Sequence, residues 1–314
     1  MKTAIKKLLK SIAINLPMGA REAVFEALWD KLGHNDKSKT IAMLVQRQGI
    51  TGFITQGDQG TIQSSSGDAE VFAVYSRTGS WAKRTNDILT KFFAPTGSGT
   101  YIDIGANIGL TTISVAQWSN VNCIAFEPEP INFYHLQANI ARNCHHRNVR
   151  LENSAVFNCT ATLQFEVATF NLGDHRVKIS YAPGQQGEES RKAIEVPAVA
   201  LDKIVSEPKL PLAVKIDTQG SEPFVFAGGK QTLALADLII LEWSPYQIRR
   251  LKGDPKIVTD FLLENFQYLV VADRESGKPD HPLPIAEGCA FMLNYIEKNQ
   301  NDPSAYIDII ANRC

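Results

Sequence analysis

The pattern of apolar and polar positions divides the chain into an amino-terminal helical part and a later part in which strands and helices alternate. Residues 5–12 carry apolar side chains at the i, i+3, i+4, i+7 spacing of a helical stripe. A second stripe over 25–32 ends at Gly33, a residue typical of helix C-termini. We therefore expect residues 1–94 to form a helical extension followed by a connecting segment.

The connecting segment has a weaker pattern. Residues 50–70 are rich in Gly, Ser, Gln and Thr, which predicts a loop or a weak hairpin. Val71–Tyr75 reads as a short strand because of its β-branched and aromatic residues. Asn86–Phe93 reads as a helix that ends before Pro95.

From Thr100 onward, short apolar runs alternate with helical segments, and this rhythm predicts a parallel sheet with right-handed crossovers and helices on both faces. A hairpin-like connection before the last run would make the final strand antiparallel. The fold class predicted is therefore α/β, a doubly wound, Rossmann-like, seven-stranded sheet. Its strands are expected at Tyr101–Ile104, Asn122–Phe126, Val149–Val156, Leu212–Asp217, Asp237–Trp243, Tyr268–Ala272 and Gly288–Ile296.

One region interrupts the alternation. Residues 157–199 suggest an antiparallel β insertion, with strands at Thr162–Val167, Val177–Tyr181 and Ala193–Val199. The predicted organisation is thus an extension over 1–94, a sheet domain over 95–298 that contains the insertion, and a carboxyl-terminal tail over 299–314.

Composition narrows the class of protein. Among 314 residues, 32 are basic and 33 acidic, so a general nucleic-acid binder with a strongly basic face is not expected. Hydrophobic residues make up 44 % and charged residues 21 %, which is typical of a globular protein and excludes a disordered chain. No apolar run approaches the length needed to cross a bilayer.

The cysteines and the first residues bear on location. Five cysteines without a CxxC pair favour reduced thiols and a cytoplasmic protein. Four lysines within the first ten residues accompany the first apolar stripe. That segment is interpreted as a docked helix, with a weak contact to the surface of the inner membrane and a signal peptide as alternatives.

The clearest chemical motif is Asp103-Ile104-Gly105-Ala106-Asn107-Ile108-Gly109, placed where a strand turns into a helix. Glycines there let the backbone approach a ligand. Asn107 breaks the GxGxxG fingerprint of dinucleotide sites, and the acidic Asp103 suits a ligand that carries an ammonium or sulfonium group. Glu127 ends the next strand, where a carboxylate can accept both hydroxyls of a ribose. Packing glycines and a solvated glutamate are the structural alternatives.

Three segments taken together resemble the FkbM family of S-adenosylmethionine-dependent methyltransferases: Tyr101–Gly109, Ala125–Pro130 and Val214–Glu222. The resemblance covers roughly residues 95–245 and continues more weakly to about 296. It implies a class I methyltransferase fold with S-adenosylmethionine as cofactor. Known relatives mostly methylate hydroxyls on sugars or polyketides. Gln219 stands where the family pattern has Glu.

The resemblance also implies roles for individual residues. The ribose would be held by Glu127, and Ser154 would lie near the adenine. The residues that would wrap the methionine part of the cofactor are Asp103, Gly105, Asn107 and Gly109.

Strand ends of a doubly wound sheet meet in one crevice, so Asp103, Asp217 and Glu242 are expected to line it together. Lys215 lies two residues before Asp217, on the same face of its strand, and a buried ammonium needs a partner among these carboxylates. Asp217 is the first candidate for the base or the group that orients the substrate. A contact to the ammonium of the cofactor and a structural role are its alternatives.

The other candidates each have two readings. Glu242 is either a substrate contact or a structural partner of Lys215. His175 in the insertion is either a base with a pKa near neutrality or a surface residue. Glu222 is a helix cap or a chemical group, and Trp243, like Tyr246, stacks on a sugar or packs in the core.

No metal site is predicted, since the adjacent histidines that follow Cys144 rarely converge on one ion. The function expected is O-methylation of a hydroxyl-bearing small molecule or glycan by in-line methyl transfer, with no nucleic acid as partner. A non-catalytic nucleoside-binding or scaffold protein and a nicotinamide-dependent oxidoreductase are the alternatives.

Overall fold

The computed structural model describes residues 33, 37, 40, 49–145, 148–178, 191–272 and 282–313. The two amino-terminal helices expected from the sequence, and with them the membrane-surface interpretation, lie outside the described residues.

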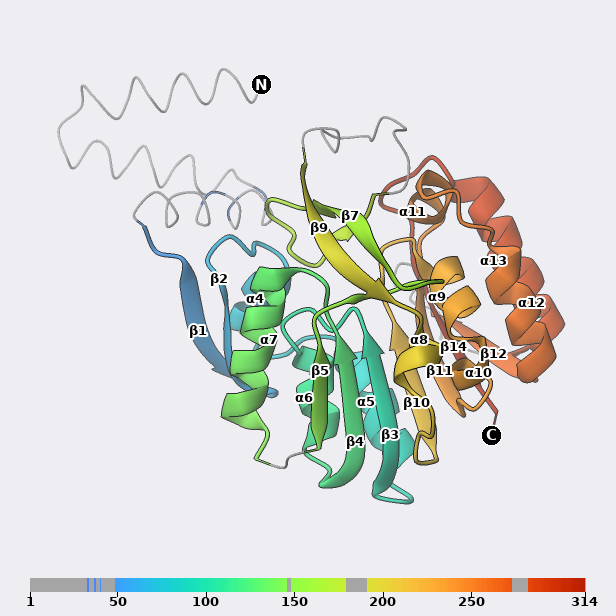
Figure 1. The fold of residues 1–314 in the computed structure, drawn as a ribbon, viewed down its shortest axis with the longest axis horizontal. Coiled ribbons are helices and arrows are strands. Elements are labelled where there is room, and N and C mark those ends of the chain that lie inside the picture. Colours follow the sequence, from blue (N-terminus) through green and yellow to red (C-terminus); the bar gives the residue numbers. More distant parts are fainter. Residues whose placement is uncertain are drawn as a thin grey trace.

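A mixed sheet forms the centre of the molecule (Figure 1). Within the described residues it has eight strands, all parallel except β13 and β14, and β14 lies antiparallel between β11 and β12. This confirms the doubly wound fold and its antiparallel last strand, and β13 adds one short strand at the edge. In spatial order the strands are β13 (Pro282–Pro284), β12 (Tyr268–Ala272), β14 (Ile307–Asn312), β11 (Leu238–Trp243), β10 (Leu212–Ile216), β3 (Ser98–Ile104), β4 (Asn120–Phe126) and β5 (Val149–Glu152).

Helices cover both faces, as the alternation of side chains along the strands requires. Ile102 and Ile104 of β3 pack in one core. Tyr101 lies in a second core, on the opposite face. The first face is covered by α8 (Leu201–Ile204), α9 (Glu222–Gly228), α10 (Lys230–Leu233), α11 (Pro245–Arg250), α12 (Lys256–Asn265) and α13 (Ile285–Asn299). The second is covered by α4 (Val71–Thr78), α5 (Lys83–Phe93), α6 (Leu110–Ala116) and α7 (Pro130–Asn143).

The end of the chain differs from the sequence prediction. The run Gly288–Ile296, predicted as the last strand, lies inside α13. The buried residues Cys289 and Met292 follow the buried Gly288 by one and four residues, which is a helical rather than an alternating spacing. The last strand is β14, inside the segment predicted as a tail, and it pairs with both β11 and β12. The sheet domain therefore extends past residue 298.

A second correction concerns Val71–Tyr75, which is helical rather than a strand. The carboxylate of Asp68 accepts the backbone N–H groups of Glu70, Val71 and Phe72, and so satisfies the start of α4. Gly79 ends the helix in the left-handed conformation.

The predicted hairpin is present and docks on α7 (Figure 1). It consists of β1 (Gly52–Gly57) and β2 (Gly60–Ser65). Asn139 exchanges hydrogen bonds with both backbone groups of Gln63, and Asn143 does the same with Thr61. Asn139 and Asn143 are four residues apart, which is a rise of about 6 Å along a helix. Gln63 and Thr61 are two residues apart, which is a rise of about 7 Å along a strand. The two amides therefore match the two residues of β2 whose backbone groups face α7. Two side chains of helix α7 thus form the hydrogen bonds that a neighbouring strand would form with the backbone of β2.

The insertion forms a separate small sheet in the order β6-β9-β7-β8. Its strands are β6 (Ala155–Val156), β7 (Ala161–Val167), β8 (Arg176–Val177) and β9 (Lys192–Val199). The predicted strand Val149–Val156 is therefore divided between two sheets. Buried Glu166 of β7 pairs with Arg176 of β8 and with Arg250 of α11, which joins the insertion to the main domain.

No helix within the described residues is long and apolar enough to span a membrane.

Candidate functional site

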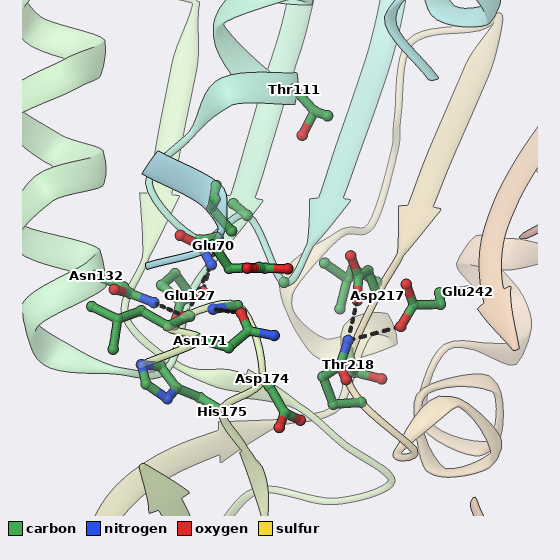
Figure 2. A pocket seen from close by; sticks show the side chains of 18 of the residues that line it. Glu70, Thr111, Glu127, Asn132, Asn171, Asp174, His175, Asp217, Thr218 and Glu242 are labelled. Atoms are coloured by element: carbon green, nitrogen blue, oxygen red, sulfur yellow. Dashed lines mark hydrogen bonds between the residues drawn. The ribbon is translucent and has the colours of Figure 1, made fainter. Parts of the chain in front are cut away.

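A pocket of about 1170 Å³ opens at the carboxyl ends of β3, β4, β10 and β11, and the insertion forms its opposite wall (Figure 2). The connection between α4 and α5 and the loop before β14 complete it. Of the residues singled out in the sequence, those that line the pocket are Gly105, Asn107, Glu127, Ser154, His175, Lys215, Asp217, Gln219 and Glu242. Asp103 and Gly109 do not line it.

The glycines of the first loop are required by close backbone contacts. Gly105 has a φ of +83°, and a Cβ there would overlap the carbonyl oxygen of Asp217. Gly109 has a φ of +92°, and a Cβ there would lie 2.6 Å from a methyl of Leu136. The loops after β3 and β10 therefore touch, so that Gly105 exposes its backbone to the pocket while Gly109 packs the helix.

Glu127 is the acidic group at the floor of the pocket and is 5 % exposed. The backbone N–H of Asn107 donates to its Oε2 at 2.9 Å, and that of Glu129 donates to its Oε1 at 2.8 Å. Each oxygen keeps a second lone pair for a ligand. Burial outweighs these hydrogen bonds and raises the pKa of Glu127 to about 8.

The side chain of Asn107 fastens the insertion rather than facing a ligand. Its Nδ2 donates to the carbonyl of Leu172 at 3.1 Å, and Asn132 of α7 donates to the same carbonyl at 2.9 Å. Its Oδ1 accepts the N–H of Ile108. Asn107 thus ties the loop after β3 to Glu127 through its backbone and to the insertion through its side chain. Asn132 gave no signal in the sequence, because one polar residue in a helix is ordinary.

Ser154 follows β5 and lines the pocket with a buried hydroxyl. Its Oγ has no hydrogen-bond partner among the described residues. A buried hydroxyl without a partner is costly, so it is suited to a polar atom of a ligand.

Asp103 does not line the pocket, contrary to the expectation that it would do so together with Asp217 and Glu242. Its side chain is fully buried and its Oδ2 accepts the hydroxyls of Thr111 at 2.7 Å and Thr112 at 2.6 Å. Alternation along β3 turns Asp103 toward α6, beneath the floor of the pocket. Asp103 reaches the pocket indirectly, through Lys215.

Lys215 pairs with carboxylates, as its place in a buried strand predicted. Its Nζ lies 3.5 Å from Oδ1 of Asp103 and 3.4 Å from Oδ2 of Asp217. Burial alone would lower the pKa of Lys215, but the surrounding carboxylates, Asp217 first, raise it above its ordinary value. Lys215 is therefore a fixed cation at the pocket wall.

Asp217 and Glu242 converge from neighbouring strand ends (Figure 2). The Nε2 of Gln219 donates to Oδ1 of Asp217 at 2.9 Å and to Oε1 of Glu242 at 2.8 Å. The side chain of Asp217 is 32 % exposed. The structure thus brings the two predicted carboxylates together and adds the amide between them.

His175 lines the pocket but does not have the properties expected of a base. Its Nδ1 accepts the N–H of Ala168 at 2.9 Å, so the neutral ring carries its proton on Nε2. Burial, with a smaller effect of Arg191, lowers the pKa of His175 to about 4. At neutral pH His175 is a hydrogen-bond donor rather than a proton acceptor.

Glu222 accepts hydrogen bonds from the loop after β10, which precedes its helix, rather than from the first turn of that helix as the cap interpretation expected. Its Oε1 accepts the backbone N–H groups of Thr218 and Gly220. Burial raises the pKa of Glu222 to about 7. It does not line the pocket, so it supports the loop that carries Asp217.

The aromatic residues near β11 are in the core. Trp243 is fully buried and its Nε1 donates to the carbonyl of Met292, and Tyr246 is also buried. The aromatic residues that line the pocket are instead Trp81, Phe126, Phe165, Phe170 and Tyr306. Trp81 and Tyr306 lie outside the motifs, and the sequence held no signal for them.

Among the described residues, no group of three or more His, Cys, Asp or Glu is placed to hold a metal ion.

Comparison with known proteins gives a match to the methyltransferase FkbM domain over residues 103–270, which is more than half of the chain. No curated protein matches the chain.

The solved structures similar to the chain include several different methyltransferases. An O-methyltransferase from Bacillus cereus in complex with SAH has 11 % identity and a TM-score of 0.40, over 88 % of this chain and 99 % of that one. M. jannaschii TYW2 in complex with AdoMet has 13 % identity and a TM-score of 0.37, over 84 % and 87 %. A putative rRNA methylase from Clostridium thermocellum has 12 % identity and a TM-score of 0.39, over 74 % and 95 %.

Proposed function

Because the chain belongs to the FkbM family of methyltransferases, we propose that its pocket binds S-adenosylmethionine and promotes methyl transfer to a hydroxyl of a sugar, glycan or polyketide-like acceptor. The observation that carries the proposal is that Glu127 and Ser154 line the same pocket, and that each has polar atoms with unused hydrogen-bonding capacity.

The residues present fit the groups of this cofactor. A ribose diol needs two acceptors, and the carboxylate of Glu127 keeps two lone pairs directed away from its backbone partners. An adenine needs a polar contact, which the hydroxyl of Ser154 can supply. The carboxylates of Asp217 and Glu242 suit the positively charged part. When bound, S-adenosylmethionine supplies an electrophilic methyl group on its sulfonium sulfur.

Asp217 is proposed as the group that accepts the proton of the acceptor hydroxyl. It is the more accessible of the carboxylates paired with Lys215. A positioned base typically contributes about 10²–10⁴-fold to such a reaction. Glu242 is proposed to orient the hydroxyl, and the insertion, which forms the opposite wall of the pocket, is proposed to exclude water from it. His175, with its Nε2–H, is assigned a hydrogen bond to a ligand and not proton abstraction.

Two expectations from the sequence stay predictions: that nucleic acid is not the acceptor and that the protein is cytoplasmic. For the first residues a docked helix stays the prediction, with a weak contact to the surface of the inner membrane as an alternative.

The direct test incubates the full chain with S-adenosylmethionine and a panel of glycans and polyketide-like alcohols. Intact-mass analysis should show one acceptor that gains the mass of a methyl group. Asp217→Asn should bind the cofactor and lose at least about 100-fold in turnover. Unchanged turnover in Asp217→Asn would reject Asp217 as the base, and a methyl group found on nitrogen or carbon would reject the O-methylation proposed here.

A further inference from the structure

Gln219 occupies the pocket between the two carboxylates on which the proposed chemistry depends. It lies in the loop that follows β10 and lines the pocket with Asp217 and Glu242. Figure 2 shows two dashed lines that meet at one nitrogen between these carboxylates. The amide NH₂ has two hydrogens, and each serves one carboxylate.

The charges around this amide explain why it matters. Lys215 is the cation in contact with Asp217, and it also neutralises Asp103 of β3. Glu242 of β11 lies in register with Asp308 of β14, which brings a third carboxylate to this wall, and Lys83 and Arg84 of α5 also line the pocket. Two ionised carboxylates that share one site disfavour each other's charge unless donors lie between them. The NH₂ of Gln219 is such a donor for both.

The backbone conformation at Gln219 indicates that the turn does not require a glutamine side chain. Its φ is +54°, in the left-handed region that residues with a Cβ rarely adopt. The following Gly220 has a φ of +105°, and a Cβ there would lie 2.6 Å from the backbone of Gln247. A glycine at 219 would form the same turn with less strain. The backbone is therefore held in an unfavourable conformation at the one residue whose amide ties the carboxylates together.

We propose that Gln219 is a positioning residue of the methyl-transfer site, which holds Asp217 and Glu242 in one orientation through its two amide hydrogens. The inference rests on the proposed function, because the carboxylates matter only if they act on a bound ligand. A glutamate at 219, the residue of the family pattern, has the same shape and no donor unless it is protonated. A protonated carboxyl has one hydrogen, which it can donate to only one of the two carboxylates, Asp217 or Glu242. We therefore expect Gln219→Glu to retain a proton in this cluster that the wild type does not hold.

The test compares the wild type with Gln219→Glu and with Gln219→Gly, which removes the amide and suits the left-handed backbone. Gln267→Glu is the matched control, because Gln267 is exposed and far from the pocket. Calorimetric titration with S-adenosylmethionine at pH 7, in two buffers of different ionisation enthalpy, counts the protons released on binding. Thermal unfolding of each protein from pH 5 to 8 measures the same ionisation without any ligand.

We expect Gln219→Glu to release a larger fraction of a proton than the wild type, because a bound cation drives off the proton shared by the cluster. Its stability should equal that of the wild type near pH 5 and fall relative to it as the pH rises, by up to about tenfold in the unfolding constant per pH unit. Gln219→Gly should bind the cofactor within about threefold of the wild type and lose at least about tenfold in turnover at the pH optimum. Gln267→Glu should behave as the wild type in each measurement.

The inference is overturned if Gln219→Glu matches the wild type in both the proton count and the pH dependence of unfolding. It is also overturned if Gln219→Gly keeps full turnover. A wild type that unfolds cooperatively but gives no heat with S-adenosylmethionine would instead reject the proposed function. In that case the unfolding series still decides whether Gln219→Glu retains a proton that the wild type does not hold.

Discussion

The raised pKa of Glu127 makes the affinity for S-adenosylmethionine depend on pH in a defined direction. A buried carboxyl with a pKa of about 8 is mostly protonated at neutral pH. Both of its oxygens already accept backbone N–H groups, and two ribose hydroxyls can donate to them fully only when the carboxyl is ionised. Binding should therefore strengthen as the pH rises toward 8 and reach a plateau above it.

The size of the effect follows from the fraction ionised. With a pKa of about 8, roughly one Glu127 in ten is ionised at pH 7, so the apparent Kd should be about tenfold weaker there than on the plateau. That factor corresponds to about 1.4 kcal/mol, and at pH 6 it grows to about 100-fold. The same shift acts on folding: the stability that the protonated group provides below its unfolded pKa is lost as the pH rises through about 8.

Glu127→Gln removes the titration and one of the two acceptors. In the wild type, one backbone N–H donates to Oε1 and another to Oε2. The amide of the variant places an NH₂ group opposite one of these donors, so that hydrogen bond is lost, together with one contact to the ribose. Hydrogen bonds to charged groups contribute about 1.5–3 kcal/mol each, so the Kd at pH 9 should weaken by about 10- to 100-fold or more.

Calorimetric titration with S-adenosylmethionine from pH 6 to 9 measures both effects. The variant should give a flat pH profile, and the exposed Glu195→Gln should reproduce the wild-type profile. A wild-type Kd that does not change with pH, or a Glu127→Gln variant that binds as tightly as the wild type at pH 9, would refute the assignment.

Three further predictions concern the loop, the hairpin and the insertion. Gly105→Ala places a Cβ on the carbonyl oxygen of Asp217 at a φ of +83°, so calorimetry should show cofactor affinity reduced by more than about tenfold and thermal unfolding a lower midpoint; unchanged values would contradict the loop contact. Asn139→Ala leaves the N–H and C=O of Gln63 without their partner, at a cost of about 1–3 kcal/mol for each group that stays buried, and denaturant unfolding should reveal the loss. Because buried His175 must stay neutral, the wild type should lose stability relative to His175→Gln as the pH falls from 6.5 toward 4, by up to about 1.4 kcal/mol per pH unit; an unchanged difference between the two proteins would contradict the burial of His175.

The sheet could be predicted because its strands carry their own signal. Continuous apolar runs such as Leu212–Ile216 alternate with helical periodicity, and right-handed crossovers then leave few strand orders. The meeting of Asp217 with Glu242 followed from that order alone. The pairing of Lys215 followed from the cost of an unpaired buried cation.

Short apolar segments were misjudged where composition and periodicity disagreed. Val71–Tyr75 has strand-like residues, but Asp68 caps its backbone N–H groups and favours the helix. Gly288–Ile296 is helical because its buried residues follow a helical period, and its glycine allows close packing against Leu269. In both segments, strand propensity is outweighed, by a local helix cap in the first and by packing in the second.

The finer features of the site depend on side-chain direction, which spacing does not give. Asp103 turns beneath the pocket because of alternation along β3, and Trp243 turns into the core on β11. The role of His175 depends on an N–H from its own loop. The amide of Gln219 became meaningful only when two strand ends were seen to meet at it.

The central claim is that one pocket, bounded by Gly105, Glu127 and Ser154, binds the nucleoside of S-adenosylmethionine. A crystal structure of the full chain with S-adenosylhomocysteine, the product of methyl transfer, tests it most directly. The account predicts ribose hydroxyls within hydrogen-bond distance of Glu127 and the adenine against Ser154. A nucleoside bound elsewhere, or a pocket left empty at saturating ligand, would contradict it.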